Sequence, residues 1–195
     1  DTTESRGLGD VYKRQLGPHA TDTVSASMWR RIAEIAERES LPIHAHLAQS
    51  VEEVERVAER DNTTPVGLLL KAGVLEAAPK ALLVHNLFLT EADLNALGHH
   101  HTTAVMGFCP RSQWVFAFPA DPRRWDAVNL PWVLGTDCTA SNDTLSIGLE
   151  LTSCAAALRG RVAHGGPYQR FLAGEGSPAT VWRARQEERA QTTGA

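Results

Sequence analysis

Side chains that could bind a metal ion stand at or near the ends of several predicted strands. His44 and His46 lie in "LPIHAHLAQS", His85 closes the apolar run "KALLVHN", and Asp137 closes "PWVLGTD". Neutral imidazole and carboxylate groups are ligands that zinc or iron accepts, and a site with an open position also binds water. Such a metal can lower the pKa of its water from about 15.7 towards 7. These residue types therefore point to metal-assisted hydrolysis.

The elements that position these side chains alternate between strands and helices. Apolar strands are predicted at 41–48, 80–86, 103–109 and 131–137, and helices at 24–40, 51–60, 65–74, 91–98 and about 143–158. Ser50 with Glu53, and Thr90 with Asp93, predict capping boxes at two helix starts. A Trp-rich and Pro-rich loop is predicted from Pro110, followed by a short helical stretch at 122–128.

Continuous apolar strands that are each followed by a helix are typical of parallel strands covered on both faces, in a doubly wound sheet or a (β/α) barrel. Barrel enzymes place their polar groups at the carboxyl ends of the strands, as here. The glycine-rich phosphate turn of a doubly wound sheet has no counterpart in this sequence. A closed barrel needs eight strands, and four are clear, or five with 16–20. We therefore expect an α/β fold, a partial TIM-like barrel of about strands four to eight.

The two ends of the chain do not continue this pattern. Residues 1–15, "DTTESRGLGDVYKRQ", show no helical or strand period, and "DVYKRQ" resembles translated sequencing-adapter read-through. We expect 1–15 to be a non-native or disordered leader, 16–160 to form the partial barrel, and 161–195 to be a truncated C-terminal helical segment.

Composition and charge narrow the classes of partner. A net charge of -4 without a basic stripe argues against nucleic acid, and charged residues interrupt the longest apolar stretch, which argues against a membrane. Three unpaired cysteines fit reduced thiols in a cytoplasmic protein, and we expect all three to be buried. A small-molecule substrate is the favoured partner, and a homo-oligomer of the full-length protein is kept as an expectation.

Five stretches in order carry a resemblance to a known family: "GPHATDTVS", "IHAHLAQS", "LLVHNLFLT", "CPRSQ" and "LGTDCTASNDTL". Together they resemble the amidohydrolase superfamily, in particular the cytosine deaminase-like branch that includes chlorohydrolases and adenosine-type deaminases. The resemblance covers about residues 16–158. It implies a metal-dependent hydrolase of carbon–nitrogen bonds other than peptide bonds, of the deaminase or amidohydrolase type, acting on a small nitrogen heterocycle.

The resemblance also implies roles for individual residues. His46 and Asp137 would bind one divalent metal, zinc or else iron, and Asp137 would accept a proton from the attacking water. His85 would contact that water or the substrate, and His19 would line the substrate pocket. The family completes its metal site with a His-x-His pair on the first strand, which this chain lacks, so we expect the isolated chain to be inactive.

Gln49 departs from the family pattern. The deaminases of this branch carry glutamate at this position, where it moves a proton to the substrate. A carboxamide donates and accepts hydrogen bonds but does not titrate, so Gln49 can only position a substrate. General acid–base catalysis is worth about 10²- to 10⁴-fold. The sequence thus leaves open a non-catalytic or chemically altered member of the family.

Other interpretations remain beside these. A thiol hydrolase that uses Cys109 with His85 is a further alternative. His44 is interpreted as a structural neighbour of His46, and the run at 99–101 as exposed loop at the far end of the barrel. Ser112 and Asn142 could contact substrate or serve as turn and capping residues. The aromatic stretch 114–119 could face the substrate or pack in the interior.

Overall fold

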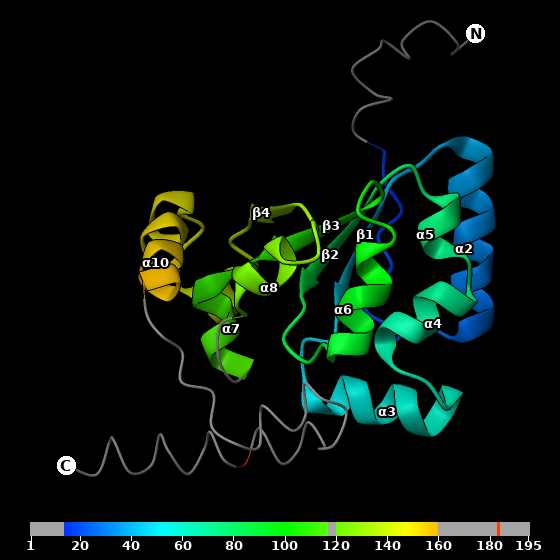
Figure 1. Cartoon of the computed structure of the whole chain (residues 1–195), viewed down its shortest axis with the longest axis horizontal. Coiled ribbons are helices and arrows are strands. Elements are labelled where there is room, and N and C mark those ends of the chain that lie inside the picture. Colours follow the sequence, from blue (N-terminus) through cyan, green and yellow to red (C-terminus); the bar gives the residue numbers. More distant parts are fainter. Residues whose placement is uncertain (1–13, 117–119, 160–182, 184–195) are drawn as a thin grey trace, which may run out of the picture.

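The computed structural model describes residues 14–116, 120–159 and 183 (Figure 1). The predicted leader therefore lies outside the described residues except for Arg14 and Gln15. The predicted C-terminal segment lies outside them except for Arg183. Within the described ranges, the α/β fold and the parallel sheet expected from the sequence are confirmed.

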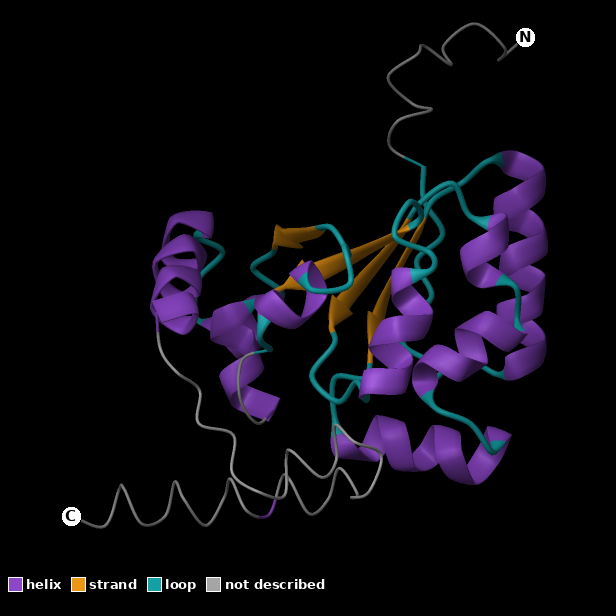
Figure 2. Cartoon of the chain, in the orientation of Figure 1, coloured by secondary structure: helices purple, strands orange, loops and turns teal. Residues whose placement is uncertain are grey.

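Four parallel strands form one twisted sheet in the order β1-β2-β3-β4 (Figure 2). They are β1 (Ile43–Leu47), β2 (Ala81–His85), β3 (Ala104–Phe108) and β4 (Trp132–Leu134). Leu16 and Ala20 form parallel bridges with β1, so the segment at 16–20 lies beside the sheet as the end of a fifth strand would. Each predicted strand is present, although each is shorter than its apolar run.

Nine helices within the described ranges accompany the sheet. They are α2 (Ala26–Glu39), α3 (Val51–Asp61), α4 (Pro65–Lys71), α5 (Val74–Ala77), α6 (Glu91–Gly98), α7 (Pro110–Phe116), α8 (Pro122–Asp126), α9 (Thr139–Asn142) and α10 (Ile147–Arg159). In Figure 1, α2, α4 and α5 lie together beyond β1, and α10 lies at the β4 end. In the part of the chain that is described, no helix combines the length and the hydropathy that a membrane span requires.

Local sequence explains most helix starts. At α6 the predicted capping box of Thr90 and Asp93 is present in both directions. At α3 the hydroxyl of Ser50 accepts from the Glu53 N–H at 3.2 Å, which is half of a capping box. The other half was predicted wrongly, because the Glu53 carboxylate accepts from Gln49 and Thr21 instead.

Three predicted elements need correction. The stretch from Pro110 is the helix α7 and not a loop, because proline at a first helical position is compatible with helix formation. The helix expected over 65–74 is interrupted at Gly73, whose φ of 73° ends α4 and separates it from α5. The helix expected from about Asp143 begins at Ile147, because Asp143 is itself left-handed and ends α9.

The two faces of the sheet differ. On β1, alternate residues Ile43, Ala45 and Leu47 are buried with the helices, whereas His44 and His46 between them are only half-buried. The next strand follows the same alternation, because Ile43 pairs with Ala81 and Ala45 pairs with Leu83. One face of the sheet therefore packs in the core, and the opposite face presents the two histidines.

Candidate metal centre

Three of the predicted site residues meet at the carboxyl ends of the strands. His46 near the end of β1, His85 at the end of β2 and Asp137 after β4 each offer one ligand atom, and these atoms lie within 4.8 Å of one another. His46 and His85 are 39 positions apart in the chain, and His85 and Asp137 are 52 positions apart. The parallel order of the strands brings all three together. Two imidazole nitrogens and a carboxylate oxygen form a donor set that suits a zinc-type ion.

The side chain of His46 is oriented by the segment that precedes α2. Its Nδ1 lies 2.9 Å from the backbone carbonyl oxygen of His19, and the two imidazole rings are 5.0 Å apart. Because a carbonyl only accepts, Nδ1 must carry the proton, which leaves the lone pair on Nε2. Metal-binding histidines commonly have their other nitrogen engaged in this way.

The position of His85 does not follow from strand alternation. His85 pairs with Leu47, a core residue, so a regular strand would direct its side chain towards the helices. Instead its backbone is left-handed, with φ of 78°, and its ring stacks on His46 with centroids 5.2 Å apart and planes 14° apart. The left-handed backbone at the end of β2 therefore turns the His85 ring away from the core and towards His46.

Burial sets the protonation of His85. Its side chain is buried, and this burial lowers the pKa of His85 to about 4; the Asp137 carboxylate opposes the shift, whereas His46 adds to it. The Nε2 atom lies 3.7 Å from Oδ2 of Asp137. A neutral imidazole at pH 7 can accept or donate one hydrogen bond, or bind a metal.

Asp137 follows β4 in a left-handed conformation, with φ of 56°. Its Oδ2 accepts a hydrogen bond from the hydroxyl of Ser141 at 2.9 Å, which fixes one carboxylate oxygen. Behind it, Asn142 donates to the Thr136 carbonyl and to the buried Glu150 carboxylate. The turn that carries Asp137 is therefore fastened to α10.

The two residues with open interpretations are structural. Asn142 is 3% exposed and has the buried contacts just described. Ser112 is fully buried, and its hydroxyl donates to the Cys109 carbonyl at 3.2 Å. These contacts favour the turn and capping interpretation for both residues, and neither lines the cavity at the cluster that is described below.

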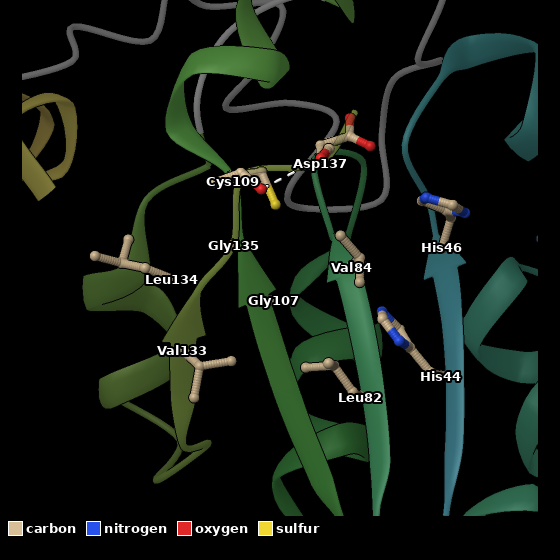
Figure 3. A pocket seen from close by; sticks show the side chains of 11 residues that line it. His44, His46, Leu82, Val84, Gly107, Cys109, Val133, Leu134, Gly135 and Asp137 are labelled. Atoms are coloured by element: carbon tan, nitrogen blue, oxygen red, sulfur yellow. Dashed lines mark hydrogen bonds between the residues drawn. The ribbon is translucent and has the colours of Figure 1, made fainter. Parts of the chain in front are cut away.

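A cavity of about 360 Å³ lies next to the cluster, on the face of the sheet that presents His44 and His46 (Figure 3). It is lined by His44, His46, Leu82, Val84, Gly107, Cys109, Val133, Leu134, Gly135, Thr136 and Asp137. His44 stands below His46 on the same strand, and burial together with the nearby His46 lowers the pKa of His44. The side chain of His44 contacts Gln15 at 3.3 Å and takes no part in the three-residue cluster.

Gln49 lies in the turn between β1 and α3 and is half-buried. Its backbone N–H donates to the Glu53 carboxylate at 2.8 Å, and Gln49 is not among the residues that line the cavity. The structure therefore brings together His46, His85 and Asp137, with His19 beside them. It places Gln49 at the same end of the sheet without a described side-chain contact to the cluster.

The cysteines differ from one another, which corrects the expectation that all three are buried. Cys109 and Cys154 are buried, whereas Cys138 is exposed. Burial raises the pKa of the Cys109 thiol to about 12, with Asp137 and Glu150 adding to the shift. A thiol with such a pKa is protonated at neutral pH and is a poor nucleophile, so the geometry disfavours the thiol-hydrolase alternative.

The histidine run 99–101 lies in the turn between α6 and β3, where His99 and His101 are exposed. This is the amino end of β3, opposite the cluster. The interpretation as exposed loop is therefore confirmed for His99 and His101, whereas His100 is half-buried with its Nε2 3.7 Å from the Glu76 carboxylate.

Residues 4–173 match the model of the amidohydrolase family. The chain belongs to this family. It is 34% identical over 143 residues to a 5-methylthioadenosine/S-adenosylhomocysteine deaminase of Nitratidesulfovibrio vulgaris, a match that covers 72% of this chain and 31% of that protein. It is 32% identical over 149 residues to a 5'-deoxyadenosine deaminase of Methanothrix thermoacetophila, covering 75% of this chain and 35% of that protein. The chain thus spans about a third of the length of these curated relatives.

Solved structures share the fold. An adenosine deaminase from Xanthomonas campestris with bound zinc superimposes with a TM-score of 0.67 at 24% identity, covering 74% of this chain and 32% of that one. A mutant atrazine chlorohydrolase from Arthrobacter aurescens, complexed with zinc and atraton, gives a TM-score of 0.59 at 18% identity, covering 67% of this chain and 28% of that one. The partial barrel expected from the sequence agrees with these likenesses.

Proposed function

We propose that this chain is the C-terminal part of the barrel of a metal-dependent hydrolase that acts on carbon–nitrogen bonds other than peptide bonds. Residues 16–160 would form the barrel part. The observation that carries the proposal is the meeting of His46, His85 and Asp137 within 4.8 Å at the carboxyl ends of separate strands. The matching deaminases support hydrolysis of an amino group on a small nitrogen heterocycle.

In this proposal His46 and Asp137 bind one divalent ion, zinc by preference, together with a His-x-His pair from outside this chain. Such an ion supplies Lewis acidity, which lowers the pKa of water and thereby favours attack on the substrate. The Asp137 carboxylate accepts the proton of the attacking water, and its fixed Oδ2 leaves Oδ1 as the freer acceptor. The His85 imidazole, neutral at pH 7, donates a hydrogen bond that orients the substrate.

Two features support the view that further barrel elements accompany this segment. The chain spans about a third of the deaminases that it matches. In addition, α10 and the turn before it present large apolar side chains to solvent, with Ile147 53%, Leu145 60% and Leu151 61% exposed. Apolar surface of this kind on an outer helix calls for a covering element.

The proposal is tested on the protein expressed from its complete coding sequence. Ammonia release is measured with 5'-deoxyadenosine, 5-methylthioadenosine and S-adenosylhomocysteine, before and after dialysis against a chelator. We expect turnover of at least one amino-heterocycle, loss of turnover on dialysis, and recovery with added zinc. Turnover that survives complete metal removal, or the absence of turnover from the zinc-loaded protein on amino-heterocycles, would contradict the proposal.

Gln49 favours a second candidate, a family member that binds its ligand without turnover or with altered chemistry. An amide at this position cannot move a proton, whereas the relatives' activity as deaminases requires proton transfer. Gln49→Glu in the complete protein separates the two. A deaminase limited by its proton carrier gains about 10²-fold or more in kcat. A protein that only binds shows unchanged affinity for 5'-deoxyadenosine and no ammonia release in either form.

A further inference from the structure

We propose that Gln113 is a positioning residue that places His85 in the site, an inference that rests on the proposed function for its catalytic consequence. Gln113 lies in α7, follows β3 and has no exposed surface. It belongs to neither the three-residue cluster nor the lining of the cavity. Its link to the site runs through the backbone of His85.

Both ends of the Gln113 amide have a backbone partner. Its Nε2 donates to the carbonyl oxygen of His85 at 2.9 Å, and its Oε1 accepts from the N–H of Ala120 at 2.7 Å. A fully buried amide whose donor and acceptor are both engaged fixes the groups that it contacts, because breaking either bond leaves part of the buried Gln113 amide unsatisfied. Gln113 therefore fastens the end of β2 to the start of the segment that leads into α8.

The end of β2 needs such a contact because its backbone is irregular. His85 and Asn86 are both left-handed, with φ of 78° and 58°, a conformation that side chains other than glycine rarely adopt. Asn86 is buried, and its Nδ2 donates to the Leu83 carbonyl at 2.6 Å, which stabilises the turn from one side. Gln113 acts on the other side, at the carbonyl of His85 itself.

This backbone conformation decides where the His85 ring lies. A regular strand paired with Leu47 would direct the His85 ring into the core. With the left-handed backbone, the ring stacks on His46. A regular extended conformation at His85 would move the ring away from Asp137, whose Oδ2 is now 3.7 Å from Nε2. Because a displacement of about 1 Å at a catalytic group can cost about 10²-fold in rate, the Gln113 contact governs turnover more than binding.

The test compares Gln113→Met with Ser112→Ala in the complete, zinc-loaded protein. Methionine has a similar volume to glutamine and removes both hydrogen bonds. Ser112→Ala removes one buried hydrogen bond from the same helix, to Cys109, without touching His85. Thermal unfolding, zinc content, kcat and KM for 5'-deoxyadenosine, and a crystal structure are obtained for both. Activities are measured well below both melting temperatures.

We expect Gln113→Met to displace the His85 ring relative to His46 and to lower kcat by about 10- to 100-fold, with KM within about threefold and zinc content unchanged. Ser112→Ala should keep the ring in place and lose less than about threefold in kcat. If Gln113→Met does not fold, Gln113→Asn, which withdraws the amide by one methylene group, replaces it with the same expectation.

Two outcomes would overturn the inference. One is a His85 ring in its original place in the Gln113 variant; the other is a kcat that falls no further than in Ser112→Ala. The ring position does not depend on turnover, so the crystal structures decide the positioning role even if the wild type releases no ammonia. If the wild type releases no ammonia, the proposed function fails, but the crystal structures still show whether Gln113 places His85.

Discussion

The carboxylate of Glu53 accepts a hydrogen bond from the backbone N–H of Gln49 at 2.8 Å, four residues before it in the chain. The other carboxylate oxygen of Glu53 accepts from the hydroxyl of Thr21. Glu53 is 1% exposed, and burial raises its pKa, although hydrogen bonds from Thr21, Gln49 and Ala48 counter part of that rise. One buried carboxylate thus joins the turn after β1 to the segment that carries His19.

Glu53→Ala should destabilise the protein by about 1–3 kcal/mol, because it leaves the buried Thr21 hydroxyl and the half-buried Gln49 N–H without their acceptor. Glu52→Ala is the matched control, since Glu52 is exposed in the same helical turn and its loss should cost less than about 0.5 kcal/mol. Urea-induced unfolding at pH 7 gives both free energies. Equal values for the two variants would show that the Glu53 contacts contribute nothing to the folded state.

The buried His85 makes stability depend on pH. Its pKa is lowered to about 4 in the folded protein from the ordinary histidine value of 6.5, so between these pH values the unfolded chain binds a proton that the folded chain does not. The contribution of His85 to stability is therefore complete above about pH 6.5 and is lost as the pH falls towards 4, by up to about 3 kcal/mol.

The measurement is the unfolding free energy of metal-free protein between pH 7 and 4, for the wild type and for His85→Gln. The variant should lose less stability over this interval than the wild type. His101→Gln, at an exposed site in the far turn, should follow the wild-type curve. Parallel curves for the wild type and His85→Gln would contradict the lowered pKa.

Much of the fold could be predicted because its signals are local. Apolar runs located all four strands, and Thr90 with Asp93 located the start of α6. The helix α7 was missed because a Trp-rich and Pro-rich composition suggested a loop, whereas proline at a first helical position is compatible with a helix. Segment ends were the least accurate, since Gly73 and Asp143 break helices through backbone conformation rather than through apolar period.

The sequence predicted the three residues that meet at the candidate site, but not the residues that hold them in place. The positions of His46, His85 and Asp137 at strand ends were readable from the sequence. Strand period alone would have directed His85 into the core, and only the left-handed backbone at its position explains its actual place. Glu53 was noticed only as half of a capping box and Gln113 only as the end of the stretch "CPRSQ"; their contacts to Thr21 and to the His85 carbonyl join residues far apart in the chain, which no local pattern predicts.

The thiol alternative predicts that loss of Cys109 abolishes activity. We expect the opposite, because burial raises the pKa of Cys109 to about 12. Cys109→Ala should keep more than about a tenth of the wild-type kcat, with any loss reflecting a small cavity. Inactivation by iodoacetamide would not decide the question, because Cys138 is exposed beside Asp137 and its pKa is lowered by hydrogen bonds from Ser141 and the Ala140 backbone.

The measurement is therefore kcat, with and without iodoacetamide treatment, for Cys109→Ala and for the parallel variant Cys138→Ala. Retained turnover in Cys109→Ala, together with protection of Cys138→Ala from iodoacetamide, would assign any alkylation effect to Cys138. Complete loss of turnover in folded Cys109→Ala with its zinc retained would restore the thiol mechanism.

The central claim is that His46, and not its neighbour His44, is a metal ligand. Both residues lie on the same face of β1, but only His46 belongs to the cluster with His85 and Asp137. The most direct measurement is the zinc dissociation constant of the complete protein, by competition with a chelator, for His46→Asn and His44→Asn. We predict that His46→Asn weakens zinc binding by at least about tenfold and that His44→Asn stays within about threefold of the wild type. Wild-type zinc affinity in a folded His46→Asn protein would contradict the account.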